Sequence, residues 1–460
     1  MPADRADGID LSSFLIAVNA VIAAAILVLY AVRGPNDYVG TYTVCLSLAF
    51  AAQNFFFLLV TGRRPNPFLL LLVVHALVFY ELRVATLLWE PWSMVFVRNS
   101  FGAADLGNGL LFVILSNFAI FFGVTAHSEK YADPAPLAGD GRASVRLLLP
   151  VLLLNIAVLL EFNFKALSAL KGYLGIFLNA DILLLFSLVV MVLYYDVMSK
   201  RQKALLFCSI FVFIASRTVS GSRSAMVTLC FYLFCVWFGV NGRVLFRKKL
   251  YMALLAALPV AVSLFLFATA VRSPRLQLQA RTIFDRIGFL DMSSEVIANR
   301  LPYSAVINFE HYFKSVVDSG LTPGFSVFEA PKAANLLSFI NNGMPAVSLK
   351  AVHENYESDM FTVYAEPYVL FGPVWGLIAI FAAAFLFQRA YRSLAGRDLF
   401  KLAVFRATLL VLFYTYFLDS FGIDWFLVDM IRFAVPFTIL LFLFAKYAQY
   451  IPNHRSGASK

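Results

Sequence analysis

Apolar runs of similar length recur along almost the whole chain, and they restrict the possible folds more than any other feature. A helix that crosses a bilayer needs about 20 consecutive, mainly apolar residues. Hydrophobic residues make up 61% of the 460 residues and charged residues only 14%, against roughly 25% charged in an ordinary soluble domain. We therefore expect an all-α polytopic integral membrane protein with about 12 transmembrane helices. The runs lie near residues 12–32, 40–60, 68–89, 107–126, 146–162, 177–198, 203–219, 223–240, 250–271, 362–388, 402–419 and 426–448.

Lysine and arginine concentrate in the even-numbered connections between these runs. Because basic residues are retained on the cytoplasmic side, we expect both termini in the cytoplasm and the odd-numbered connections outside it. The net charge of +10 is then mainly a signal of topology. A nucleic-acid-binding function is disfavoured, because no soluble basic domain is expected to carry it.

One connection is far longer than the others. Most connections in compact domains have about 4–6 residues, and loops much longer than this are functional or disordered. The aromatic and aliphatic residues of this connection argue against disorder, so we expect short amphipathic helices within it. The expected divisions are transmembrane helices 1–9 (residues 1–271), the long outer loop (272–361), transmembrane helices 10–12 (362–448) and a cytoplasmic tail (449–460).

Two arginines, Arg217 and Arg223, flank a Ser-Gly-Ser turn between the seventh and eighth runs. The continuously apolar part of the seventh run, 204–215, is too short to cross, so the helix either extends through Arg217 or breaks before the surface. A helix that begins near Arg223 would offer free N–H groups and a positive dipole end to a phosphate. The alternative is that both side chains reach lipid headgroups at the membrane surface.

The long loop opens with the segment VRSPRLQLQARTIFDRIGFLD. Apolar residues at helical spacing between Ser273 and Leu290 predict an amphipathic helix at the outer interface. Arg275 and Arg286 differ by about 20° around this helix, at about 100° per residue, and Arg272 precedes it. Arginine suits bidentate contact with phosphate oxygens. Substrate phosphate and lipid headgroups remain equal alternatives as the partners of these three residues.

Glu366 lies near the start of the tenth run, in the segment FTVYAEPYVLFGPVWG. A carboxylate at the edge of an apolar helix is costly, which indicates a function. The alternative is a structural role as the partner of one of the arginines. Pro367 and Pro373 are expected to bend the start of this helix, and Gly372 and Gly376, four residues apart, indicate close helix packing.

Three motifs, in this order, resemble the oligosaccharide repeat unit polymerases, the O-antigen polymerase or Wzy-type family. They are SGSRSA around Arg223, the arginine-rich start of the long loop (RSPR … FDRIGFLD … NR), and T-x-x-x-E-x-Y-x-x-F-G-x-x-x-G from Thr362 to Gly376. The resemblance implies a multi-pass glycosyltransferase of the bacterial inner membrane that acts on undecaprenyl-diphosphate-linked oligosaccharides at the periplasmic face. It would transfer the growing O-antigen or exopolysaccharide chain onto the next lipid-linked repeat unit.

The implied reaction needs cations beside the leaving diphosphate and a base beside the attacking sugar hydroxyl. Arginines in a site of low dielectric can stabilise the leaving group, so we expect neither a metal nor a cofactor. A carboxylate or a histidine is the usual base. The predicted diphosphate-binding residues are Arg217, Arg223, Arg272, Arg275 and Arg286, and the predicted catalytic residues are Glu366, Asp291 and His353, with Asp359 and His311 as further candidates.

Two other functions remain open. An O-antigen ligase has a similar layout with a different acceptor, and the related ligases place a histidine before the Glu/Gly helix, although His353 lies farther away than that family's spacing suggests. A lipid-oligosaccharide flippase or transporter would need ionisable groups near the midplane, such as His75, Glu81, Arg83 and Asp181. The expected partners are undecaprenyl-diphosphate-linked oligosaccharide and membrane lipids, with a chain-length regulator and a flippase as further candidates and no nucleic acid.

Overall fold

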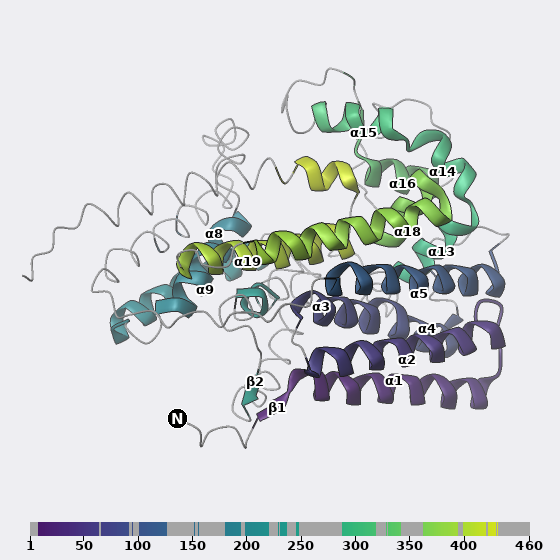
Figure 1. Cartoon of the computed structure of the whole chain (residues 1–460), viewed down its shortest axis with the longest axis horizontal. Helices are drawn as coiled ribbons and strands as arrows, with labels where there is room; N and C mark the ends of the chain where they lie inside the picture. The colour runs from purple at the N-terminus through teal and green to yellow at the C-terminus, as the bar shows by residue number, and fades with distance from the viewer. Residues whose placement is uncertain are drawn as a thin grey trace, which may run out of the picture.

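The computed structural model gives the fold of a defined part of the chain, and all structural statements below concern this part. Its helices, strands and connections are drawn in colour in Figure 1. The described residues are 8–63, 66–91, 94, 101–126, 151, 155, 180–194, 198–219, 229, 231–236, 245–247, 288–318, 328, 330–341, 362–393, 399–419, 422–428 and 430.

The N-terminal third forms a bundle of four antiparallel spans, which lie side by side in Figure 1. The third span is continuous but includes one π-helical turn, η1, in its middle. Long-range contacts hold the spans together through a large apolar core. The bundle consists of α1 (Leu11–Arg33), α2 (Thr41–Arg63), α3 (Pro67–Ala76) with η1 (Leu77–Glu81) and α4 (Leu82–Trp89), and α5 (Ala103–Thr125).

Side-chain amides connect neighbouring spans of this bundle. Asn19 donates to the carbonyl oxygen of Ala51 at 2.9 Å, and Gln53 donates to the carbonyl oxygen of Ile114 at 2.8 Å. Asn66 caps the start of α3, and Pro67 occupies the first helical position. Proline is favoured at this position because the N–H that it lacks would have no partner within the helix. The described amides therefore bond mainly to backbone carbonyls, which every helix offers.

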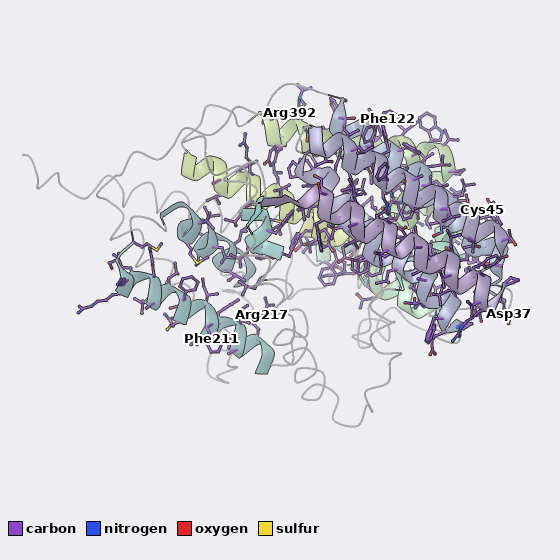
Figure 2. All side chains as sticks on the ribbon, turned by 90° about the horizontal axis from the view of Figure 1, so that it is seen from below. Asp37, Cys45, Phe122, Phe211, Arg217 and Arg392 are labelled. Carbon is purple, nitrogen blue, oxygen red and sulfur yellow. The ribbon has the colours of Figure 1, made fainter. Side chains whose placement is uncertain are left out.

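The remaining described elements lie along and beside the bundle. Figure 2 shows that Asp37, between α1 and α2, lies at one end of the bundle, which we call the α1–α2 end, while Arg392 lies toward the other end. A short antiparallel strand pair joins Gly8 to Arg247 and Asp10 to Leu245. The other elements are β1 (Gly8–Asp10), β2 (Leu245–Arg247), α8 (Ala180–Tyr194), α9 (Lys200–Val219), α13 (Phe289–Ala298), α14 (Arg300–Val306), α15 (Phe309–Val316), α16 (Ala333–Asn341), α18 (Thr362–Arg392), α19 (Leu399–Leu412) and η6 (Phe413–Leu418).

α18 is not one straight helix, because the chain reverses at Gly372. This residue has φ of 80° and ψ of −177°, outside the helical region. A β-carbon at Gly376 would lie 3.0 Å from the carbonyl oxygen of Pro367, whereas nine residues of straight helix would separate the two positions by about 13 Å. α18 is therefore a helical hairpin with a short arm, residues 362–371, and a long arm, residues 373–392.

Contacts with α5 show the direction of the short arm. The hydroxyl of Tyr364 donates to Asn117 at 2.7 Å, and the ring of Tyr368 packs on Phe112 with ring centroids 4.8 Å apart. As the number along α18 rises, the number along α5 falls, so the two helices are antiparallel here. The short arm thus begins deep beside α5 and runs back toward the α1–α2 end, where the chain turns at Gly372.

The sequence predicted that Pro367 and Pro373 bend the start of this helix. The structure instead shows that the chain reverses its direction at Gly372. Gly372 adopts a positive φ that other residues rarely take, and Pro373 has no N–H with which to continue the helix. The long arm alone extends about 30 Å, which is enough to cross a bilayer. Only this arm accounts for the tenth predicted span.

Five helical spans are long and apolar enough to cross a membrane in the described part of the chain. They coincide with the first four predicted runs and the tenth, and they support a multi-pass membrane protein. α9 continues through Arg217 to Val219, so the longer of the two alternatives for the seventh run is observed. The 403–418 segment forms a shorter apolar helix. The predicted total of about 12 helices includes runs outside the described residues and stays a prediction.

α13, which we expected within the outer loop, is inserted among the spans. All its residues from Phe289 to Ile297 are buried, and it packs on α5 and α18. A β-carbon at Gly109 of α5 would lie 2.5 Å from Cβ of Ser294, so only glycine permits this approach. The described part of the predicted loop is therefore partly integrated into the helix bundle.

Candidate functional site

Glu366, on the short arm of α18, is buried and joins three separate segments. Its exposed fraction is 2%. The hydroxyl of Tyr312 on α15 donates a short hydrogen bond to Oε1 of Glu366. The backbone N–H of Ile423 donates to the same oxygen at 2.6 Å. The carboxylate is therefore held in one place by a loop helix and by the segment that follows η6.

The site includes an apolar pocket of about 230 Å³ between the α18 hairpin and the chain from Tyr416 to Leu427. Glu366 is the one charged residue in its lining, and several lining side chains are partly exposed. Such a pocket suits a hydrocarbon chain, with the carboxylate beside it. The lining residues are Val363, Glu366, Pro367, Phe371, Ala379, Ile380, Ala383, Phe387, Tyr416, Phe417, Ile423, Phe426 and Leu427.

Arg300 lies at the hairpin turn. Its Nε–H donates to the carbonyl oxygens of Tyr368 at 3.0 Å and of Val369 at 3.3 Å. In a continuous helix the N–H of residue 373 would bond Val369, but this residue is Pro373, which has none. Arg300 therefore satisfies backbone groups that the break in α18 leaves open. It also places a cationic group next to Gly372, with Cζ 3.5 Å from the position a β-carbon would take there.

A second buried carboxylate, Asp424, lies close to the first. It accepts hydrogen bonds from the hydroxyl of Ser315 at 2.7 Å and from the N–H of Ala333, at the start of α16, at 2.8 Å. A β-carbon at Gly422 would lie 2.7 Å from Oδ1 of Asp424 and 3.5 Å from Oε1 of Glu366. Burial raises the pKa of Asp424. The two carboxylates thus fasten α15, α16 and α18 to one short segment of chain.

His311 lies on α15, the helix that also carries Tyr312 and Ser315. Its Nε2 is buried and has no hydrogen-bond partner in the described part of the chain. Burial is the main cause that lowers the pKa of His311, while Asp424 and the backbone of Pro331 act in the opposite direction. His311, a further catalytic candidate, is thus a partly buried histidine beside an acid. Burial also raises the pKa of the neighbouring Tyr312.

Asp291, a predicted catalytic residue, forms a buried ion pair with Arg83. The Nη2–Oδ2 distance is 2.5 Å and the Nε–Oδ1 distance is 3.0 Å, and both side chains are at most 1% exposed. Next to this pair, Ser293 is 2.9 Å from the hydroxyl of Thr362 and 3.4 Å from that of Tyr80. Asp291 is thus held by a cation from the third span, and this arrangement favours Glu366 over Asp291 as a base.

The structure does not bring Arg217 together with Glu366. Arg217 lies on α9 with its guanidinium 5.8 Å from the ring centroid of Phe213. Figure 1 shows α9 and the α13–α16 group on opposite sides of the molecule, and Figure 2 shows Arg217 at one end of α9. The other predicted residues of the site lie outside the described residues; these are Arg223, Arg272, Arg275, Arg286, His353 and Asp359.

Sequence reasoning missed Tyr312 and left Asp424 without a role. Tyr312 is three residues before Ser315 and one turn along from Asn308, which caps α15, so its helix was predictable but its partner was not. The described residues contain no group of three or more His, Cys, Asp or Glu side chains that could hold a metal ion. Comparisons with protein families, with curated proteins and with solved structures found no match to this chain.

Proposed function

We propose that this chain is a membrane glycosyltransferase that polymerises oligosaccharide repeat units carried on a lipid diphosphate. The proposal combines the resemblance of the sequence motifs with one structural observation. A buried carboxylate, Glu366, lines an apolar pocket at a break in a membrane helix. This combination suits a substrate with a hydrocarbon chain and a polar reacting group at its end.

In this proposal Glu366 is the general base. The hydroxyl of the acceptor sugar gives its proton to the Glu366 carboxylate and attacks the anomeric carbon of the donor sugar. The bond from that carbon to the diphosphate oxygen breaks, and the lipid diphosphate leaves with the electron pair. The hydrogen bonds from Tyr312 and Ile423 hold the carboxylate in one orientation. A base held in the right geometry lowers the barrier of proton transfer, because its orientation does not have to be found during the reaction.

The apolar pocket would hold the part of the lipid chain next to the diphosphate. Its volume of about 230 Å³ is too small for a long polyprenyl chain, so most of the chain would remain in the bilayer. Arg300, at the hairpin turn that follows Glu366 on α18, would add a positive charge near the leaving group. The roles of Arg217, Arg223, Arg272, Arg275 and Arg286 in binding the diphosphate remain predictions of the sequence.

The orientation is part of the same proposal. In this proposal the α1–α2 end lies outside the cytoplasm, as the distribution of basic residues in the connections predicts, and the hairpin turn of α18 points toward this end. Lipid-linked sugars would then react at the periplasmic face of the bacterial inner membrane, where nucleotides are absent. A lipid-linked donor needs no nucleotide at this face, because the energy for transfer lies in its own sugar-diphosphate bond.

The test is complementation of a deletion strain with Glu366→Gln, a change that keeps the shape but removes the base. We expect surface glycans that carry a single repeat unit in place of the long ladder. The matched variant is Tyr312→Phe, which keeps the carboxylate and removes one of its hydrogen bonds. We expect this variant to retain a ladder of reduced intensity, and both proteins should be present in the membrane in wild-type amounts.

The other outcomes separate the alternatives. Complete loss of surface polymer with Glu366→Gln would overturn the polymerase in favour of a ligase or a flippase. A ligase would transfer finished polymer from the lipid to an acceptor in a purified system, whereas a flippase would form no glycosidic bond. A wild-type ladder with Glu366→Gln would exclude Glu366 as the base.

A further inference from the structure

We propose that α14 and α15 form a membrane-interface anchor whose exposed apolar side chains enter the outer leaflet of the bilayer. Three of these side chains are largely exposed, namely Leu301 at 77%, Phe309 at 60% and Phe313 at 66%. This inference concerns the placement of the chain in the membrane, and it does not depend on the reaction proposed above.

The first argument is the amphipathic pattern of α15. Phe309 and Phe313 are four residues apart and share one side of the helix, since each residue turns it by about 100°. Glu310 and Lys314 lie about 100° away on the next side and form an exposed ion pair at 2.5 Å. Tyr312 faces the protein and is buried. A short helix with apolar, charged and buried sides fits a position where lipid, water and protein meet.

The second argument is the depth at which this helix is attached. The ring of Phe309 packs on Phe371, at the end of the short arm of α18, with centroids 5.3 Å apart. Tyr368, three residues earlier on that arm, packs on Phe112 of α5. Phe112 lies about 13 Å along α5 from its first residue, Ala103, at about 1.5 Å per residue. α15 is thus fixed beside a span, below the level at which that span begins.

The third argument is the continuity of the apolar surface. Beyond the hairpin turn, the long arm exposes Val374 at 65% and Trp375 at 66%. This arm is a membrane span, so its exposed apolar side chains face lipid. Phe309 continues the same surface through Phe371, which is 36% exposed. Lipid chains that cover Val374 and Trp375 would therefore also meet the apolar side of α15.

The anchor has a consequence for the site. Tyr312 lies between the two exposed phenylalanines and bonds Glu366. If α15 rests in the interface, Tyr312 connects this level with the site. Glu366 itself lies deeper, because Tyr364 and Tyr368 on either side of it contact Asn117 and Phe112 in the middle of α5.

The experiment measures the environment of α15 by spin labelling in the full-length protein. A variant without the native cysteines Cys45, Cys208, Cys230 and Cys235 is reconstituted in nanodiscs, and a nitroxide is attached at Phe313→Cys. The matched control carries the label at Glu310→Cys, on the charged side of the same helix. We expect the label at position 313 to collide more often with oxygen, which concentrates in lipid, than with a water-soluble nickel chelate, and the order to reverse at position 310.

Two results would overturn the anchor. The first is greater access of the nickel chelate than of oxygen at position 313, which would place the phenylalanines in water. The second is poor access of both reagents, which would mean that protein covers the patch; dipolar broadening lost on dilution with unlabelled protein would identify a second copy. Should Phe313→Cys fail to fold, the label is placed at Leu301→Cys, the most exposed of the three positions.

Discussion

The four-span bundle and the inserted part, α13 to α18, are held together in different ways. In the bundle, amides such as Gln53 bond to backbone carbonyls of a neighbouring helix, and their second polar atom is often buried with no partner among the described residues. The inserted part is instead held by pairs of side chains far apart in the sequence: Asp291 pairs with Arg83 of the bundle, and Tyr312 pairs with Glu366. The bundle therefore needs apolar helices of the right length, whereas the inserted part needs particular polar pairs.

This difference predicts unequal sensitivity to substitution. Loss of one partner from a buried ion pair leaves an uncompensated charge. Loss of an amide that bonds only to a backbone carbonyl leaves no unpaired polar group, because that carbonyl keeps its hydrogen bond within its own helix. The predictions below start from the largest expected effect.

The largest effect is expected for Asp291→Ala. It leaves the guanidinium of Arg83 buried without its carboxylate, and removal of one partner from such a pair costs about 3–5 kcal/mol. The free energy of unfolding is measured by denaturant titration of the protein in mixed micelles. The control in the bundle is Gln53→Leu, for which we expect a change below about 1 kcal/mol.

A double variant sharpens this result. Arg83→Met with Asp291→Leu removes both charges, and replacement of a buried pair by apolar residues is often neutral. Recovery of most of the lost stability would show that the unpaired charge is the cause. A double variant as unstable as Asp291→Ala would mean that packing around α13 matters more than the pair.

A smaller effect is expected at the hairpin. Gly376→Val forces a side chain against the backbone of Pro367, with the β-carbon 3.0 Å from its carbonyl oxygen, and such overpacking costs about 1–3 kcal/mol. Gly102→Ala is the control, because no atom of the described residues lies within 4 Å of a β-carbon there. Thermal unfolding of both purified variants is the measurement. Equal melting temperatures would contradict the close approach of the two arms.

The dependence of stability on pH tests the outer part of the inserted region. The pKa of His311 is lowered by burial, so the unfolded chain takes up a proton more readily than the folded one. Stability is then fully present above the ordinary histidine pKa of about 6.5 and falls as the pH drops below it. We expect His311→Gln to flatten this decline in unfolding measurements at several pH values. A variant with the same decline as the wild type would assign it to another group.

The smallest effect is expected for Glu310→Gln. This side chain is exposed, and its pKa is lowered by the hydrogen bond from Lys314. Exposed ion pairs contribute little to stability, so we expect no measurable change in the melting temperature. A clear loss would show that the charged side of α15 has a partner, and would contradict a position facing water.

The sequence predicted the spans of the bundle closely, because each is a continuous apolar run of the length that a bilayer requires. It also singled out Glu366, since a carboxylate in such a run is unusual. It did not predict the reversal at Gly372. The hydropathy of residues 362–371 is the same whether they continue the helix or fold back beside it. Only the glycine and the proline at the turn, Gly372 and Pro373, indicate a break.

The partners of the polar residues could not be predicted either. Asp291 and Arg83 are separated by more than 200 residues, and no local pattern connects them. The same holds for Tyr312 and Glu366, which lie on different elements. Periodicity describes one helix at a time, so it predicts short helices within the loop but not which spans those helices contact. The predicted arginine cluster depends on the same kind of long-range pairing and stays a prediction.

The pairing of β1 with β2 connects residues that are made at very different times. Gly8 meets Arg247, and at a synthesis rate of about 5–20 residues per second the partner strand appears roughly 10–50 s after the first. The leading end of the nascent chain must therefore wait, unpaired, while most of the N-terminal half is translated and inserted. Closure of this contact would mark a late step in the biogenesis of the protein.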